Sequence, residues 1–271
     1  MLQFLKKHKH KICYIFVILV LLIPPLCINN YTVYALTEVG TIQKVLKYIF
    51  GNQIVKYIPG LTLCLKTVNC IFLLLFIFNK PIKKHFNIYV FIYMMFITLT
   101  QNIAWIDEYG LVISTGSLLL MLMTCIIWLL HIRKEKEDIK VNKKFLWMFL
   151  IVLLCIWYPL DKNAQFEFVI DPIQHYFSSS MYCFNFPVFV SFLLIFYKNN
   201  YGLFYELMAL VGFLFGIIAV VVNLTYKTGM PNALMHIPLV VSSLTLFIHS
   251  WYVKYQIKKR EKSRIICEDW F

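Results

Sequence analysis

Residues 204–223 read FYELMALVGFLFGIIAVVVN, twenty consecutive positions with a single charged side chain, Glu206. A helix of about 20 apolar residues matches the hydrocarbon thickness of a bilayer, so this stretch predicts a transmembrane helix. Seven more apolar segments occur along the chain: Ile12–Ile28, Gly60–Asn79, Phe86–Trp105, Leu111–His131, Phe145–Leu160, Tyr182–Tyr197 and Ala233–Val253. The pattern predicts an all-α fold, a polytopic membrane helix bundle with about eight transmembrane helices.

The composition of the chain agrees with this fold class. Of its 271 residues, 61% are hydrophobic and 14% are charged, and the mean hydropathy is +0.72. A soluble domain has about a quarter of its residues charged. The formal net charge of +13 comes from short basic clusters between apolar segments, which is typical of membrane topology and excludes nucleic acid as the expected partner. The eight cysteines include no C-x-x-C pair, so neither a disulfide framework nor a metal site is expected.

The basic residues gather on alternate connections between the apolar segments. Lysine and arginine clusters precede the first segment and follow the second, fourth and last ones, and Lys198 follows the sixth. The opposite connections carry acidic residues such as Asp107 and Glu108, and few basic ones. Because basic loops stay on the cytoplasmic side, both termini are predicted to be cytoplasmic, in a multi-pass protein of the cell membrane whose first partner is the lipid bilayer.

The beginning of the chain allows two interpretations. A basic patch, Lys6–Lys11, precedes the first apolar segment, so residues 1–30 form either a retained first helix (a signal anchor) or a signal peptide cleaved near Ala35. The next segment, 42–58, has apolar residues at helical spacing, with Gln43, Lys44 and Lys47 on the other side. This spacing predicts an amphipathic helix in the membrane interface.

The order of the apolar segments predicts a single integral membrane domain over residues 1–271. Its helices are arranged as a first helix, a three-helix unit, a linker helix and a second three-helix unit. Residues 60–131 form a first three-helix unit, 145–160 a linker helix, 182–253 a second three-helix unit, and 254–271 a basic cytoplasmic tail. Leu73–Phe76 aligns with Leu193–Phe196 at an offset of 120 residues, so the two units are candidate parallel repeats. The arrangement resembles that of small sugar transporters built from paired three-helix repeats, in the number of spans only.

Several polar residues fall inside the predicted spans, where polar side chains are costly and often mark a functional site. The candidate ligand-binding residues are Lys66, Asn69, Gln101, Asn102, Asn185 and His236. They predict a small-molecule permease or membrane binding subunit with a polar intramembrane cavity. Its expected partners are a small-molecule or lipid substrate and a second subunit. No cofactor is expected. Each residue type also has an explanation without a ligand. The lysine can extend to the membrane interface, the amides can bond a neighbouring helix, and the histidine can be a packing residue. Glu206 is explained by the preference for a carboxylate in the first turn of a helix.

A second function rests on Cys183 and His236, which lie at similar predicted depth and are candidate catalytic residues. A cysteine and a histidine at one depth can form a nucleophile–base pair. The stretch from Cys183 through Glu206 to His236 resembles the acyltransferase-like membrane family typified by the bacterial YwaF proteins, over less than a third of the chain. The resemblance implies that Cys183 and His236 are the working pair of a membrane-embedded lipid-modifying transferase. The sequence departs from that family just before Cys183, where Met181-Tyr182 replaces the family's Leu-Pro/His-Leu pattern.

Overall fold

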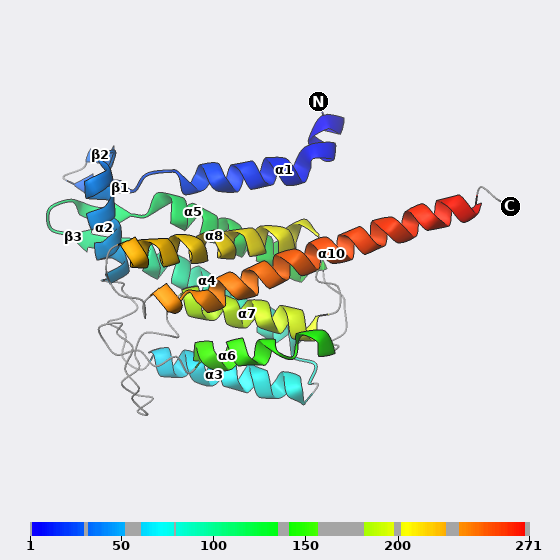
Figure 1. The fold of residues 1–271 in the computed structure, drawn as a ribbon. Helices are drawn as coiled ribbons and strands as arrows, with labels where there is room; N and C mark the ends of the chain where they lie inside the picture. The colour runs from blue at the N-terminus through cyan, green and yellow to red at the C-terminus, as the bar shows by residue number, and fades with distance from the viewer. Residues whose placement is uncertain are drawn as a thin grey trace.

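The structure is a computed structural model that describes residues 2–29, 32–51, 61–78, 80–134, 141–156, 182–197, 202–225 and 233–268. These residues are mostly helical, and a small sheet lies at one end of the molecule (Figure 1). Eight of the helices lie side by side with their axes roughly aligned. They are α1 (Leu2–Leu21), α3 (Leu61–Ile77), α4 (Lys83–Gln101), α5 (Thr115–Lys134), α6 (Met148–Ile156), α7 (Tyr182–Phe196), α8 (Leu203–Thr225) and α10 (Ile237–Glu268).

Each of these helices overlaps one of the eight predicted apolar segments, so the predicted helical fold class is confirmed at that level. Two of the described helices are long and apolar enough to cross a bilayer by length and composition, Leu203–Thr225 and Ile237–Arg260. Shorter apolar helices include Leu63–Ile77, Thr115–Leu130 and Tyr182–Phe196. Residues 157–160 of the predicted linker helix lie outside the described residues.

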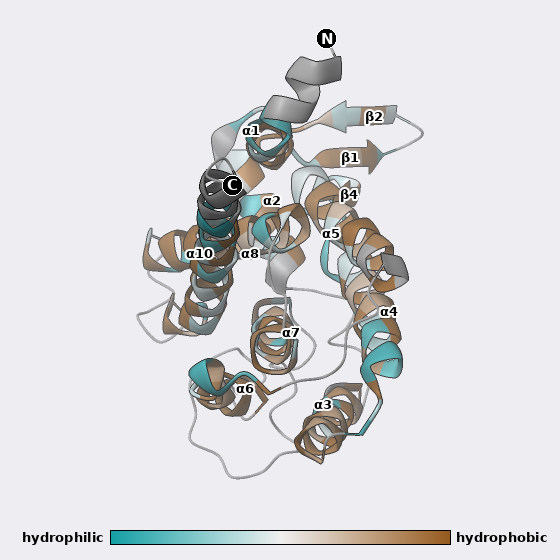
Figure 2. Cartoon of the chain, turned by 90° about the vertical axis from the view of Figure 1, so that its right-hand side faces the viewer, coloured by the Kyte–Doolittle hydropathy of each residue, from teal (hydrophilic) through white to brown (hydrophobic). Residues whose placement is uncertain are grey.

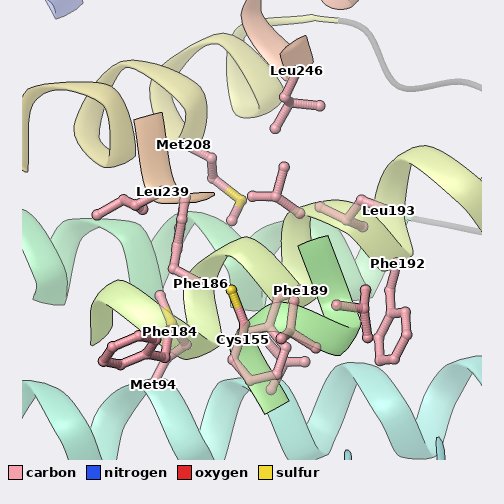
Figure 3. Packing of buried hydrophobic residues seen from close by; sticks show 14 of the residues in the cluster. Met94, Cys155, Phe184, Phe186, Phe189, Phe192, Leu193, Met208, Leu239 and Leu246 are labelled. Carbon is pink, nitrogen blue, oxygen red and sulfur yellow. The ribbon is translucent and has the colours of Figure 1, made fainter. Parts of the chain in front are cut away.

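Helix α7 is the central element of the bundle. In Figure 2 the other helices surround it, and all of its residues from Tyr182 to Phe196 are buried. A helix that is apolar on all sides is stable only where every face has a neighbour, which explains this position. Figure 3 shows the resulting core, in which side chains of α7 meet those of α4, α6, α8 and α10.

Helices α8 and α10 approach closely at a pair of glycines that the sequence analysis did not single out. A Cβ atom placed on Gly212 would lie 2.4 Å from the Phe186 ring and 2.4 Å from Ser243 Oγ. One placed on Gly216 would lie 2.7 Å from Val240 Cγ2. Two small residues four positions apart allow helix backbones to pack closely, as in the G-x-x-x-G arrangement of membrane helices.

The four-stranded sheet was not predicted. Its strands are β1 (Leu26–Asn29), β2 (Thr32–Ala35), β3 (Ile103–Ile106) and β4 (Gly110–Ile113), antiparallel in the order β2-β1-β4-β3. Three predicted helical segments therefore overlap strands, since Ile28, Trp105 and Leu111 belong to the sheet. Short apolar runs rich in isoleucine and valine do not distinguish a strand from a helix end.

Gly110 explains why β1 and β4 can pair at this point. Its φ angle is +70°, a conformation that side chains disfavour. A Cβ atom at this position would lie 2.3 Å from the carbonyl oxygen of Ile28 on β1. The sheet thus joins the end of α1 to the turn between α4 and α5.

Helix α2 (Val39–Gly51) covers this sheet and overlaps the predicted amphipathic helix over residues 42–51. Val45 and Ile49 are buried in a cluster with Cys27 and Val112 of the sheet. On the exposed side, Lys44 Nζ lies 3.3 Å from Glu108 Oε2. Hydrogen bonds from Tyr109 and Lys44 lower the pKa of Glu108. Residues 52–58 lie outside the described part of the chain.

Both ends of the chain lie at the end of the bundle opposite the sheet, and α10 projects beyond the other helices there (Figure 1). Basic residues lie at this end in the connections and at the start of α4: Lys80, Lys83, Lys84, Lys143 and Lys144. Lys254, Lys258, Lys259 and Arg260 lie on the last part of α10. We call this the basic end, and the other the sheet end.

Candidate functional site

A chain of hydrogen bonds between amide and hydroxyl groups links three helices inside the bundle. Asn69 on α3 donates from Nδ2 to Asn185 Oδ1 on α7, over 3.1 Å. Tyr89 on α4 donates from its hydroxyl to Asn69 Oδ1, over 2.9 Å. Asn69 and Asn185 are 1% and 2% exposed. The structure therefore brings together two of the predicted ligand-binding residues, from segments 116 positions apart.

Lys66 precedes Asn69 by one helical turn on the face of α3 that contacts the bundle. Residues three positions apart lie on the same side of a helix, and Leu65, Asn69 and Phe76 are buried on that side. Lys66 itself is 9% exposed. Among the described residues it forms no hydrogen bond and no ion pair. We refer to Lys66, Asn69, Tyr89 and Asn185 as the interior polar group.

Gln101 and Asn102 lie at the sheet end of α4 and contact other partners. Gln101 Oε1 accepts a hydrogen bond from the backbone N–H of Tyr182, the first residue of α7, over 3.1 Å. This bond satisfies one of the N–H groups that the start of a helix leaves without a partner. Asn102 Nδ2 donates to the Thr98 carbonyl over 2.8 Å, while its buried Oδ1 atom has no partner among the residues that the structure describes. The Tyr182 hydroxyl is also buried, and no described residue bonds it.

His236 and Cys183 both lie near the sheet end, at the starts of α10 and α7. His236 is partly buried, and its Nδ1 atom has no hydrogen-bond partner in the described part of the chain. Cys183 is 6% exposed and belongs to the main apolar cluster. No hydrogen bond joins these two side chains, both of which the structure describes. Their roles as nucleophile and base remain a prediction.

A second polar cluster, which the sequence analysis did not predict, lies at the basic end around Glu206. Glu206 is in the first turn of α8, as expected for a favourable helix N-terminus, but its side chain is 1% exposed and has partners on two other helices. His10 Nδ1 of α1 lies 2.7 Å from Glu206 Oε2. Lys254 Nζ of α10 lies 3.1 Å from Glu206 Oε1.

Tyr14 completes this cluster, one turn after His10 on α1. Its hydroxyl donates to Glu206 Oε2 over 2.5 Å. Both carboxylate oxygens are thus bonded, as a buried charge requires. We call His10, Tyr14, Glu206 and Lys254 the Glu206 clasp. The spacing of four between His10 and Tyr14 indicates a shared helix face, but no sequence pattern pairs that face with Glu206.

Comparison with known protein families, with curated proteins and with solved structures found no match to this chain. The resemblance of residues 183–236 to the YwaF-type proteins therefore stays an expectation drawn from those residues.

Proposed function

We propose that the chain is a multi-pass membrane protein in which the eight aligned helices are transmembrane spans. The first support is the outward face of the bundle. In α8, and again in the first part of α10, only 33% of the most apolar 18-residue stretch is buried. Most of these residues therefore face outward, unlike those of a core helix in a soluble protein. Other helices also expose large apolar side chains, including Ile15, Phe16, Leu19, Ile92, Leu99, Leu150 and Leu153. Lipid is the solvent that such a surface requires.

Aromatic side chains support the same proposal at both ends of the bundle. Trp105 and Tyr34 are exposed on the sheet. Trp251 and Tyr255 are exposed on α10 close to the basic residues that follow it. Tryptophan and tyrosine are enriched where a span meets the headgroup region. We place the basic end in the cytoplasm, together with both termini, because basic residues favour that side.

Helix α1 is, in this proposal, a retained first span and not a cleaved signal peptide. Val17 and Val20 are buried against Leu120 of α5 and Val211 of α8. The following strand β1 pairs with β4 in the middle of the sheet. Cleavage near Ala35 would remove α1, β1 and β2 together and expose both surfaces.

Within this architecture, we propose a small-molecule permease or membrane binding subunit whose ligand contacts the interior polar group. The observation that carries this proposal is the bonded chain from Tyr89 through Asn69 to Asn185, which lies at the central helix of a bundle with an apolar outer face. Polar groups at such depth are costly and are kept mainly where they serve a function or join helices. Asn102 Oδ1 and Tyr182 Oη, which no described residue bonds, could supply further polar contacts to the ligand towards the sheet end.

Native mass spectrometry of the full chain purified from membranes tests this function. We expect a small molecule to co-purify with the wild type and to be lost from the double variant Asn69→Leu, Asn185→Leu. Ser191→Ala is the matched control, because Ser191 is also buried on α7 but, among the described residues, bonds only its own helix, at the Pro187 carbonyl. A molecule retained equally by all three proteins would contradict the site.

The lipid-modifying transferase with Cys183 and His236 is the weaker alternative. A nucleophile and its base need to come within hydrogen-bond reach, and no such bond joins these two described side chains. The same mass spectra test it, since a covalent adduct on Cys183 that His236→Ala abolishes would support the transferase.

A further inference from the structure

We propose that the outward side of α10 binds anionic phospholipid headgroups at the basic end, with Lys258 as the main contact to a lipid phosphate. This inference rests on the proposed membrane architecture and adds the kind of lipid that the surface selects. The observation behind it is the order of exposed side chains along one side of α10, which changes from apolar to aromatic and then to basic.

Exposed side chains at helical spacing form this surface. Residues three or four positions apart lie on the same side of a helix, and steps of four and three connect Leu244, Ile248, Trp251, Tyr255 and Lys258. Trp251 and Tyr255 are 64% and 57% exposed, and Leu244 and Ile248 are exposed as well. Lys258 is exposed one turn beyond Tyr255. We call these residues the α10 stripe.

The length of α10 places Lys258 at the level of the headgroups. A helix rises about 1.5 Å per residue and the hydrocarbon layer is about 30 Å thick, so about 20 residues cross it. Counted from Ile237, the first residue of α10, the crossing ends close to Tyr255. Trp251 and Tyr255 then lie at the boundary where aromatic side chains are enriched, and Lys258 lies just beyond it. In Figure 1, α10 continues past the other helices at this end.

The charge of this end fits an anionic partner. Residues 254–271 contain six Lys or Arg residues and three Asp or Glu residues. Lys80, Lys84 and Lys143 are exposed at the same end of the bundle. Basic residues directly beyond a span attract anionic lipids. A zwitterionic headgroup leaves this positive charge uncompensated, whereas an anionic headgroup matches it.

The Glu206 clasp anchors α10 to the bundle beside the stripe. Lys254 lies one turn before Lys258, and its Nζ is 3.1 Å from Glu206 Oε1 on α8. His10 of α1 bonds the other oxygen of the same carboxylate. These contacts fix the rotation of α10 about its axis at the basic end. Lys254 thus has a partner within the protein, and Lys258 lies beyond the clasp, where the headgroups begin.

Thermal unfolding of the full chain in lipid nanodiscs tests the inference. The discs contain phosphatidylcholine alone, or phosphatidylcholine partly replaced by the anionic phosphatidylglycerol. We expect phosphatidylglycerol to raise the Tm of the wild type and of Lys258→Arg, and to raise that of Lys258→Gln much less. Lys44→Gln is the matched control, because it removes the same charge at the sheet end, where Lys44 lies beside Glu108. Its Tm should rise as that of the wild type does.

Native mass spectrometry of the same proteins measures the retained lipids directly. Loss of one lysine near the membrane surface is expected to lower the affinity for phosphatidylglycerol about fivefold relative to phosphatidylcholine. Equal responses of wild type and Lys258→Gln would overturn the proposal. An equal loss in Lys44→Gln would do the same, because the effect would then follow the total charge of the chain.

A second copy of the chain is the other occupant that the apolar part of the stripe could accept. In that case the wild-type Tm would be the same in both kinds of disc and would rise with protein concentration in detergent. This result would also overturn the proposal.

The lipid proposal and the proposed function fail in different ways. One outcome is a small molecule that the Asn69→Leu, Asn185→Leu variant loses, in a protein whose Lys258→Gln variant responds to phosphatidylglycerol as the wild type does. It would remove the lipid preference and keep the binding site. A small molecule retained by the double variant, together with a lipid response that depends on Lys258, would remove the binding site and keep the lipid contact.

Discussion

Glu206 on α8 and Tyr14 on α1 are joined by a hydrogen bond of 2.5 Å between side chains 192 positions apart. With His10 and Lys254, this bond connects the first helix of the bundle, α1, to α8 and to the last helix, α10, at the basic end. A carboxylate that is 1% exposed depends on these partners, since burial removes its hydration.

Glu206→Ala is expected to destabilise the protein by about 3 kcal/mol, because it leaves Tyr14, His10 and Lys254 without their common acceptor. The measurement is thermal or denaturant unfolding in a fixed detergent. Glu108→Ala is the control, since Glu108 also pairs with a lysine but is 60% exposed in its side chain. Exposed pairs contribute about 0–1 kcal/mol, so similar losses for the two variants would contradict the clasp.

Gly212→Leu is expected to separate α8 from α10 and to lower the Tm strongly. The added side chain would begin 2.4 Å from both the Phe186 ring and Ser243 Oγ, inside a packed core. Overpacking of this kind costs about 1–3 kcal/mol or more. Gly40→Ala is the control, because a Cβ atom on Gly40 of α2 meets nothing within 4 Å. Equal stability of the two variants would show that the helices are not in close contact at Gly212.

The helices were predictable from the sequence, whereas the sheet and the clasp were not. Hydropathy detects long apolar runs such as residues 204–223 because span length is set by the bilayer. It carries no information about the pairing of Leu26–Asn29 with Gly110–Ile113, which are about 80 positions apart and similar in composition to helix ends.

The candidate site shows the same limit. Asn69 and Asn185 were identified singly, as polar residues at membrane depth, but their mutual bond depends on how α3 packs beside α7. Tyr89 was missed because a tyrosine inside an apolar helix is ordinary in composition. Glu206 was interpreted as a helix N-terminal residue, and its three partners come from helices that no local pattern brings together.

The mature protein is expected to contain α1, because this helix supplies two partners of Glu206 and buries Val17 and Val20. Intact-mass measurement of C-terminally tagged protein from membranes checks this. A mass corresponding to a chain that begins after Ala35 would contradict it. Labelling of intact cells tests the orientation: a cysteine-directed label that does not cross membranes should reach Glu108→Cys from outside the cell and not Lys258→Cys.

Two tyrosine substitutions separate a bonded hydroxyl from an unbonded one inside the bundle. Tyr89→Phe removes the donor to Asn69 Oδ1 and should cost about 1 kcal/mol of unfolding free energy, because a buried acceptor loses its partner. Tyr182→Phe removes a buried hydroxyl that has no partner among the described residues, so it should be neutral or stabilising. Unfolding in detergent, without added ligand, compares the two.

The change in stability caused by Tyr182→Phe also tests whether Tyr182 contacts the ligand. If the hydroxyl of Tyr182 contacts the ligand, the variant keeps its stability and binds the co-purifying molecule less tightly. If the hydroxyl is instead bonded to a water molecule, the variant loses stability and its ligand affinity is unchanged. A loss of stability as large as that of Tyr89→Phe, without any change in binding, would therefore exclude Tyr182 from the ligand site and leave Asn69, Asn185 and Lys66 as its described polar contacts.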